Sequence, residues 1–402
     1  MWRNVTSDLA ELRFKRIITM SQAWHSEVHP SRLATNASGT AAFELPVAGS
    51  PYAWHAHEFV FGFSMAAVAG FLLTAVPNWT GTLPLSGAPL GGLFVVWIAG
   101  RVMMAVSGLM PQWGVAVADL SFLPMLGAFA ARQLLVKPAP RNLVFLIILF
   151  LLTLVNLAYH LATMGVVSLD PLAVVRTGLM CVSIVIAIIG GRIIPAFTHN
   201  WLHLKTVAGP RPRRIDWLDR ASILSLVTFA ALLALAAQPA LIASVALLAC
   251  SLNGARLFLW RGWATRSAPI VFILHIGYAW LVAGLLLSAA SAWTAAVPAS
   301  IASHAFATGA AGTMILAVMT RASLGHTGRS IAAPRAVIWS YFFITIAALT
   351  RVAGPIFAPQ NPATVLTIAA LAWIAAFVLF TAVYTRILTT PRIHTKVSGT
   401  LP

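Results

Sequence analysis

Eleven stretches of about 20 mostly apolar residues follow one another along this chain, and each could cross the roughly 30 Å hydrocarbon core of a bilayer as a helix. Only 9% of the 402 residues are charged, against 59% that are hydrophobic, which excludes an ordinary water-soluble domain with about 25% charged residues. The sequence therefore predicts an all-α fold, a polytopic transmembrane helical bundle. Its eleven clear spans are expected near 57–77, 89–109, 114–135, 142–165, 172–195, 218–236, 239–260, 268–290, 297–320, 334–353 and 363–388.

Basic residues account for the formal net charge of +17, and they gather in alternate connections between the spans and at the C-terminus. Lysine and arginine accumulate in the cytoplasmic loops of membrane proteins. The charge therefore indicates topology and no nucleic-acid partner, and it predicts a cytoplasmic tail at 391–402. The residues concerned are Arg132, Lys137, Arg141, Lys205, Arg211, Arg213, Arg214, Arg220, Arg256, Arg261, Arg266, Arg329, Arg335, Arg392 and Lys396.

Residues 1–53 form an atypical N-terminal segment ahead of the membrane domain at 54–390. Eleven spans and a cytoplasmic C-terminus place the N-terminus outside, yet its basic residues are typical of a cytoplasmic segment. Two interpretations remain open. Residues 17–53 form a weak twelfth span, or they form an amphipathic segment that lies on the membrane surface.

This topology makes a direct prediction about labelling. The connections near 136–141, 196–217, 261–267 and 321–334 are expected to face the cytoplasm because they hold most of the loop lysine and arginine. A cysteine introduced near Pro210 should not react with a membrane-impermeant probe in intact cells. Reaction there would overturn both the topology and the depths derived from it.

Polar side chains inside membrane spans are costly and usually functional, and in this chain several fall at one depth. At a rise of about 1.5 Å per residue, they lie in or near the outer halves of their spans. Neutral imidazole binds haem iron, copper and zinc, and arginine suits a carboxylate such as a haem propionate. These side chains together predict a metal or haem pocket. They are His55, His57, Glu58, Arg101, Asp119, His160, Arg176 and His304.

The alternative is that each histidine is a hydrogen-bonded helix-packing residue, which is the better interpretation for any one of them alone. Four histidines at one level favour the pocket. Glu58 and Asp119 are the carboxylates that we expect to act in catalysis, as proton relays.

Three further positions are candidates of a weaker kind. His275, with Tyr278 on the same helix face, is either a ligand or a packing residue. His326 lies at the inner end of its span, where a solvated role is also open. Arg192 belongs to a Gly-Gly-Arg-Ile-Ile-Pro motif that is expected to end the fifth span at Pro195, and it either binds an anion or marks the membrane interface.

A parallel internal repeat is suggested by two of the spans. Gly62 and Gly309 each follow a histidine, His57 or His304, by five residues, and both spans run from outside to inside. Repeated halves often frame a site at their interface. Chance similarity in a chain rich in glycine and alanine is the alternative.

Several blocks resemble the NnrS family of bacterial membrane proteins. They are Trp54-His55-Ala56-His57-Glu58 with Phe61-Gly62-Phe63, Gly70 to Gly81, Gly190 to Pro195 with Phe197-Thr198 and Asn200, Leu274 to Tyr278, and His304 to Arg329, which includes Met319-Thr320-Arg321. The resemblance covers about residues 54–390. It implies about twelve spans in the cytoplasmic membrane, haem b and copper as cofactors, and a role in tolerance of nitric oxide and nitrosative stress. Residues 1–53 depart from the family, whose members usually begin with an apolar span.

Two functions are compatible with these residues. The first is a haem and copper protein that binds nitric oxide and reduces it with electrons from an unknown donor; the second is a transporter of a metal, haem or a nitrosyl complex. An optical spectrum distinguishes them, because only the first predicts a redox-active haem band in the purified protein. The cofactor-binding candidates are His57, His160, His275, His304, Arg101, Arg176, Arg192 and Arg321, and the metal candidates are His55, His57, His160, His275, His304 and His326.

Overall fold

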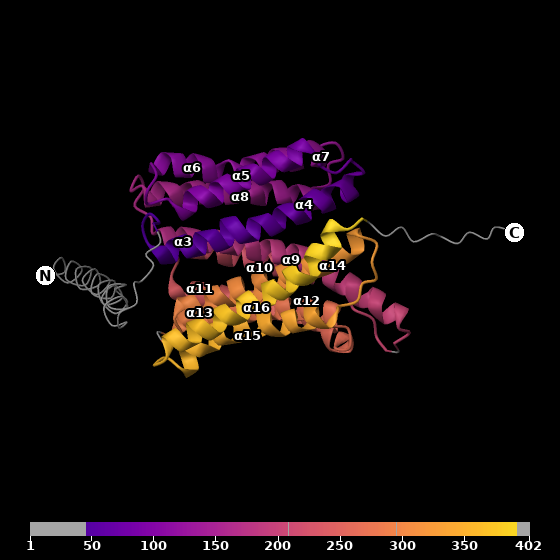
Figure 1. The fold of residues 1–402 in the computed structure, drawn as a ribbon. Helices are drawn as coiled ribbons and strands as arrows, with labels where there is room; N and C mark the ends of the chain where they lie inside the picture. Colours follow the sequence, from indigo (N-terminus) through magenta and orange to yellow (C-terminus); the bar gives the residue numbers. More distant parts are fainter. Residues whose placement is uncertain (1–45, 208, 295, 392–402) are drawn as a thin grey trace. The chain divides into compact units, whose positions relative to one another are not determined.

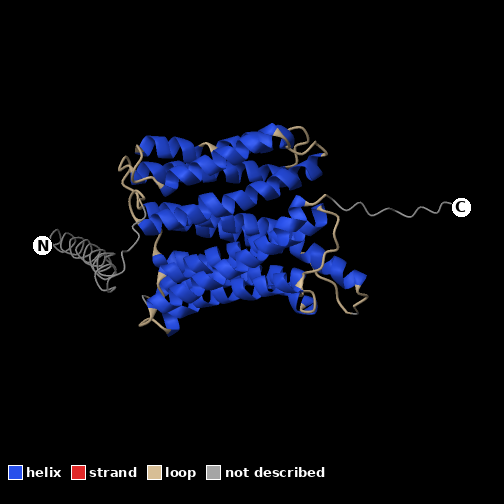
Figure 2. Ribbon diagram, viewed as in Figure 1, coloured by secondary structure: helices blue, strands red, loops and turns tan. Residues whose placement is uncertain are grey.

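The computed structural model describes residues 46–207, 209–294 and 296–391, and these residues form helices and connecting loops without a β-strand (Figure 2). Eleven helices within them are long and apolar enough to cross a membrane. The predicted all-α class and the number of clear spans are therefore confirmed. Residues 17–45 of the suggested twelfth span and nearly all of the C-terminal tail lie outside the described residues, while residues 51–53 belong to the first helix that is described.

Some of the eleven spans are divided into shorter elements, where an α-helix changes to a π-helix or is interrupted at Ser121. In the first half they comprise α3 (Pro51–His57), η1 (Glu58–Ser64), α4 (Met65–Thr80), α5 (Ala88–Ala105), α6 (Gln112–Leu120), α7 (Phe122–Leu134), α8 (Pro140–Thr163) and α9 (Pro171–Leu204). In the second half they comprise α10 (Asp216–Ala234), α11 (Pro239–Leu259), α12 (Pro269–Trp293), α13 (Ala299–His304), η3 (Ala305–Gly312), α14 (Thr313–His326), α15 (Arg335–Phe357) and α16 (Pro362–Thr389), and η2 (Gly262–Thr265) connects α11 to α12.

Proline marks the starts of many of these helices. Pro140, Pro171 and Pro239 each stand in the first helical turn, where the missing backbone N–H has no intrahelical partner in any case. Asp170 also caps α9, because its side chain accepts hydrogen bonds from two backbone N–H groups of the first turn. The starts of the spans are thus determined locally.

Helix α9 lies between two groups of helices (Figure 1). On one side it packs against α3, η1 and α8, and on the other against α10, α12 and η3. Most of its central residues are buried, from Gly178 to Gly191 without interruption. The helix that contains the Gly-Gly-Arg motif is therefore the centre of the bundle.

The expected end of the fifth span at Pro195 is wrong, since α9 continues through Pro195 to Leu204. Membrane helices tolerate an internal proline where neighbouring helices and hydroxyl side chains accommodate the disturbed backbone. Here the Thr198 hydroxyl donates to the carbonyl of Ile194, 2.9 Å away, in the affected turn.

Candidate functional site

Helix α8 supplies one wall of a buried polar cluster. Asn156 and His160 are four residues apart, so both point from the same face of α8. Tyr159, next to His160, is also buried and brings its ring against the cluster. All three side chains point toward α3 and α6 rather than to the lipid.

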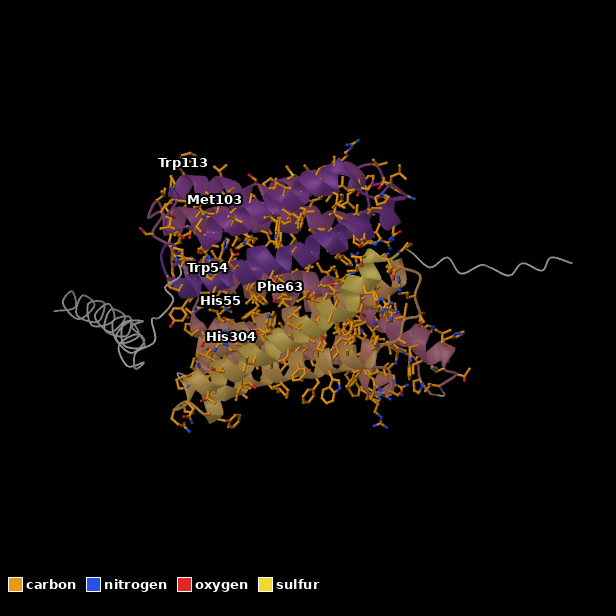
Figure 3. All side chains as sticks on the ribbon, in the orientation of Figure 1. Trp54, His55, Phe63, Met103, Trp113 and His304 are labelled. Atoms are coloured by element: carbon orange, nitrogen blue, oxygen red, sulfur yellow. The ribbon has the colours of Figure 1, made fainter. Side chains whose placement is uncertain are left out.

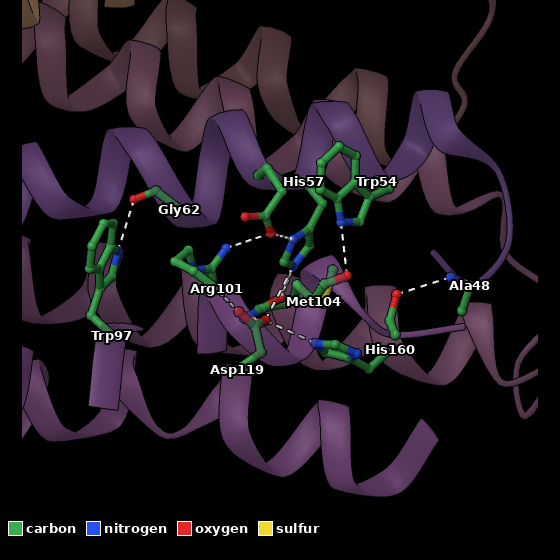
Figure 4. A network of polar contacts seen from close by, with 12 residues as sticks. Ala48, Trp54, His57, Gly62, Trp97, Arg101, Met104, Asp119 and His160 are labelled. Atoms are coloured by element: carbon green, nitrogen blue, oxygen red, sulfur yellow. Dashed lines mark hydrogen bonds and ion pairs between the residues drawn. The ribbon is translucent and has the colours of Figure 1, made fainter. Parts of the chain in front are cut away.

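His57 lies at the centre of this cluster (Figure 4). Its side chain is fully buried, and its ring stacks on Tyr159 with 4.3 Å between ring centroids. Its Nδ1 is 3.2 Å from Glu58 Oε1, and its Nε2 is 2.8 Å from Asn156 Oδ1. Both ring nitrogens thus face acceptors, so this network suits the doubly protonated imidazole.

Asp119 of α6 joins the remaining side chains. Its carboxylate accepts hydrogen bonds from Asn156 Nδ2 at 2.8 Å and His160 Nε2 at 2.9 Å, lies 3.2 Å from His57 Nε2, and accepts from Arg101. With Asp119 only 2% exposed, this many donors offset the loss of its hydration. Asp119 is therefore the shared acceptor on which the cluster depends.

Arg101 of α5 links the two carboxylates. Its Nη1 donates to Glu58 Oε1 at 2.6 Å, and its Nη2 donates to Asp119. The guanidinium passes over Gly62 of η1, where a Cβ atom would lie only 2.9 Å from Arg101 Nη1. A side chain at this position would displace the arginine, which explains the glycine in physical terms.

Three of these residues meet the geometric requirement for binding one metal ion. The ligand atoms of His57, Asp119 and His160 all lie within 4.8 Å of one another, and all three residues are buried. Two imidazoles and a carboxylate form a donor set that occurs at iron and zinc sites, and imidazole also suits copper. We call His57, Asp119 and His160 the metal cluster.

A π-helix follows each of the two histidines in the suggested repeat. His57 directly precedes η1, and His304 directly precedes η3. Single π-helical turns are rare and are often found at functional sites. The similarity of the two spans in sequence is therefore matched by the same local distortion of the helix.

His304 of α13 and His55 of α3, both labelled in Figure 3, form a second group. Arg351 of α15 lies close enough to both histidines for charge interactions. His304 Nδ1 is 2.6 Å from the Ser300 carbonyl oxygen, so Nδ1 donates that hydrogen bond, and in the neutral imidazole Nε2 then carries the lone pair. His55 is exposed at the surface of the bundle and His304 is partly buried.

The remaining predicted residues lie apart from both groups. Arg176 lines a cavity of about 220 Å³, Arg192 lines a second cavity, and Arg321 packs over the ring of Phe197 at 3.7 Å. His275 Nε2 is 2.8 Å from the Thr198 hydroxyl, and His326 is exposed. The structure thus brings together His57, Glu58, Arg101, Asp119 and His160 but not the other candidates.

The sequence analysis missed some residues of these groups. Asn156 and Tyr159 were not singled out, although the spacing of Asn156 and His160 already places them on one helix face. Arg351, in the last two turns of α15, was also missed. Arg256 was expected in a cytoplasmic connection, but it lies inside α11 and is 2% exposed, with Asp219 of α10 as its ion-pair partner.

Comparison with known proteins agrees with the resemblance. A family model described as NnrS protein matches residues 22–392. The match thus begins upstream of the resemblance at 54–390 and includes much of the atypical N-terminal segment. No curated protein matches the chain at a significant level.

Proposed function

This chain belongs to the NnrS family, and from that premise we propose that it is a haem- and copper-containing membrane protein that binds and reduces nitric oxide. The observation that carries the proposal is the metal cluster, which places buried nitrogen and oxygen donors beside a charged relay. Protection of a bacterial cell against nitrosative stress would follow from removal of the gas.

The metal cluster fits a single copper ion. His57 Nε2 and His160 Nε2 lie 3.2 and 2.9 Å from Asp119 Oδ2, and Asn156 Nδ2 donates to the same oxygen. For His57 to bind a metal, its Nε2 must lose the proton that it now shares with Asn156 and Asp119. Metal binding should therefore release a proton and weaken at acidic pH.

The same cluster does not fit haem. His57 is fully buried and packed between the rings of Tyr159 and Phe61, with centroids at 4.3 and 4.8 Å, so a porphyrin cannot approach it. His304 fits haem better, because its Nε2 is the free nitrogen and Arg351 lies near it as a partner for a propionate. Haem iron would supply a redox centre that binds nitric oxide.

Glu58 is a partly exposed carboxylate beside the buried metal cluster. Its side chain is 21% exposed, while Asp119 is fully buried, and His57 lies between them with one nitrogen toward each carboxylate. Reduction of nitric oxide to nitrous oxide and water consumes protons as well as electrons from a donor protein. With His57 Nε2 and Asp119 as metal ligands, Glu58 can still take up a proton and hold it beside the cluster, 3.2 Å from His57 Nδ1.

The test compares His57→Ala and Glu58→Ala with the wild type in a strain that lacks the protein. We expect the wild type to restore growth under nitric oxide and both variants to fail. Purified His57→Ala should lose copper, whereas Glu58→Ala should keep copper and consume nitric oxide at least about tenfold more slowly, which is within the range of general acid-base effects. His199→Ala, on an exposed histidine of α9, is the control and should behave as the wild type.

Two results would contradict the proposal. Wild-type protein that contains haem and copper but does not consume nitric oxide with a reductant would leave binding or transport as the function. Purified protein with neither cofactor would instead favour the transporter of a metal, haem or a nitrosyl complex.

A further inference from the structure

A second polar region lies far from the metal cluster. A cavity of about 490 Å³ opens between α4, α8, α9, α10 and α11. Asn142 in its wall is separated from His160 by about 27 Å along α8, at 1.5 Å per residue. The cavity therefore lies toward the opposite end of the bundle, which the distribution of lysine and arginine predicts to be cytoplasmic.

The Gly-Gly-Arg motif of α9 builds one wall of this cavity. Arg192 lies beside the stacked rings of Trp79 and Phe145, with its guanidinium carbon 5.8 and 5.5 Å from their centroids. Its Nη1 donates to Asn142 Oδ1 at 3.3 Å, and its Nη2 donates to the Arg141 carbonyl oxygen at 2.5 Å. Two aromatic rings and α8 thus hold the Arg192 side chain at the cavity wall.

The opposite wall is a buried ion pair. Arg256 Nε donates to Asp219 Oδ1 at 2.8 Å, and Arg214 Nη2 donates to Asp219 Oδ2 at 3.0 Å. Arg256 also donates to the Tyr278 hydroxyl at 2.7 Å. The carboxylate of Asp219 therefore forms ion pairs with both Arg256 and Arg214.

The lining as a whole carries an excess of positive charge. Four arginines and one aspartate line the cavity, which leaves three positive charges without a counter-charge in the lining. Among the described residues, neither Arg141 nor Arg192 has a carboxylate within 4.0 Å. Arg141 is exposed and Arg192 is partly exposed, so both can reach a ligand that enters the cavity.

We propose that this cavity is a binding site for a phosphate group, with Arg141 and Arg192 as its principal contacts. Guanidinium groups bind phosphate bidentately and with charge assistance. The phosphate belongs either to an anionic lipid head group, which basic pockets between cytoplasmic helix ends bind, or to a free anion. This site is independent of the proposed nitric oxide chemistry, because it shares no residue with the metal cluster.

Binding is tested on the purified full-length protein with two probes. One is inorganic phosphate added to protein in detergent, and the other is phosphatidylglycerol in nanodiscs that otherwise contain phosphatidylcholine. We expect Arg192→Gln and Arg141→Gln each to weaken binding by about tenfold, the effect of losing one charge-assisted contact. Arg220→Gln, on the exposed surface of α10, removes the same charge outside the cavity and should bind as the wild type does.

The outcomes separate the two sources of phosphate. Binding of both probes identifies a free anion site, and binding of phosphatidylglycerol alone identifies a lipid head-group site. The proposal is overturned if the wild type binds neither probe, or if Arg220→Gln weakens binding as much as the cavity variants. Arg141→Gln decides the matter should Arg192→Gln not fold, because Arg141 is exposed.

Discussion

Replacing Asp119 by alanine is expected to destabilise the protein by on the order of 3–5 kcal/mol, the usual cost of leaving buried charged partners without their counter-charge. The change removes the shared acceptor of Arg101, His160 and Asn156. Bound metal should be lost at the same time, because Asp119 is the only carboxylate of the metal cluster. Thermal unfolding of the purified protein and metal analysis measure the two effects.

Two further variants test whether the loss of stability is specific to the Asp119 carboxylate. Asp119→Asn keeps the shape and one acceptor oxygen, so its loss of stability should be smaller, while metal binding should still fall. Asp216→Ala removes an exposed carboxylate from the first turn of α10 and should unfold near the wild-type temperature. An Asp119→Ala protein as stable as wild type would contradict the central role given to this side chain.

Replacing Gly191 by alanine is the second change with a large expected effect. A Cβ atom at this position would overlap Arg256 Nη2. Arg256 cannot easily move aside, because it is 2% exposed, is bonded to Asp219 and Tyr278, and lies over the Trp260 ring at 5.1 Å. We expect a loss of about 1–3 kcal/mol, as for other overpacked cores, measured by thermal unfolding.

Other glycines and a double variant provide the controls. A Cβ atom at Gly190 would contact Tyr278 at 3.1 Å, which is tight but not an overlap, and one at Gly70 would meet no atom within 4 Å. The expected order of destabilisation is therefore Gly191→Ala, then Gly190→Ala, then Gly70→Ala. In an Arg256→Ala background, Gly191→Ala should cost little more, and an undiminished cost there would show that the two residues are not coupled.

Part of the candidate site could be predicted from depth alone. Placing His57, Asp119 and His160 in the outer halves of their spans was enough to group them, because each helix rises by a fixed amount per residue. The same reasoning grouped Arg176 with them, yet Arg176 lines a separate cavity between other helices. Depth restricts a residue to a level in the membrane, but it does not say which neighbour its helix face meets.

Arg256 shows the same limit of sequence-based prediction more clearly. Charge counting treated Arg256 as a loop residue, because a positive side chain near a span end usually indicates the cytoplasmic side. In the structure its guanidinium donates hydrogen bonds to Asp219 and Tyr278 and lies over the ring of Trp260. Only the packing of α9 through Gly191 makes room for it.

The sequence by itself determined the helical class and the eleven spans of this protein, because the thickness of the bilayer and the backbone's need for internal hydrogen bonds act on each segment separately. The tertiary structure alone decided that Asn156 and Tyr159 complete the surroundings of His57, and that Asp219 is shared by Arg214 and Arg256. These contacts depend on the rotation of each helix about its axis and on which helix packs beside it. Both are set by the fit of side chains between helices, which the apolar length of a span does not encode.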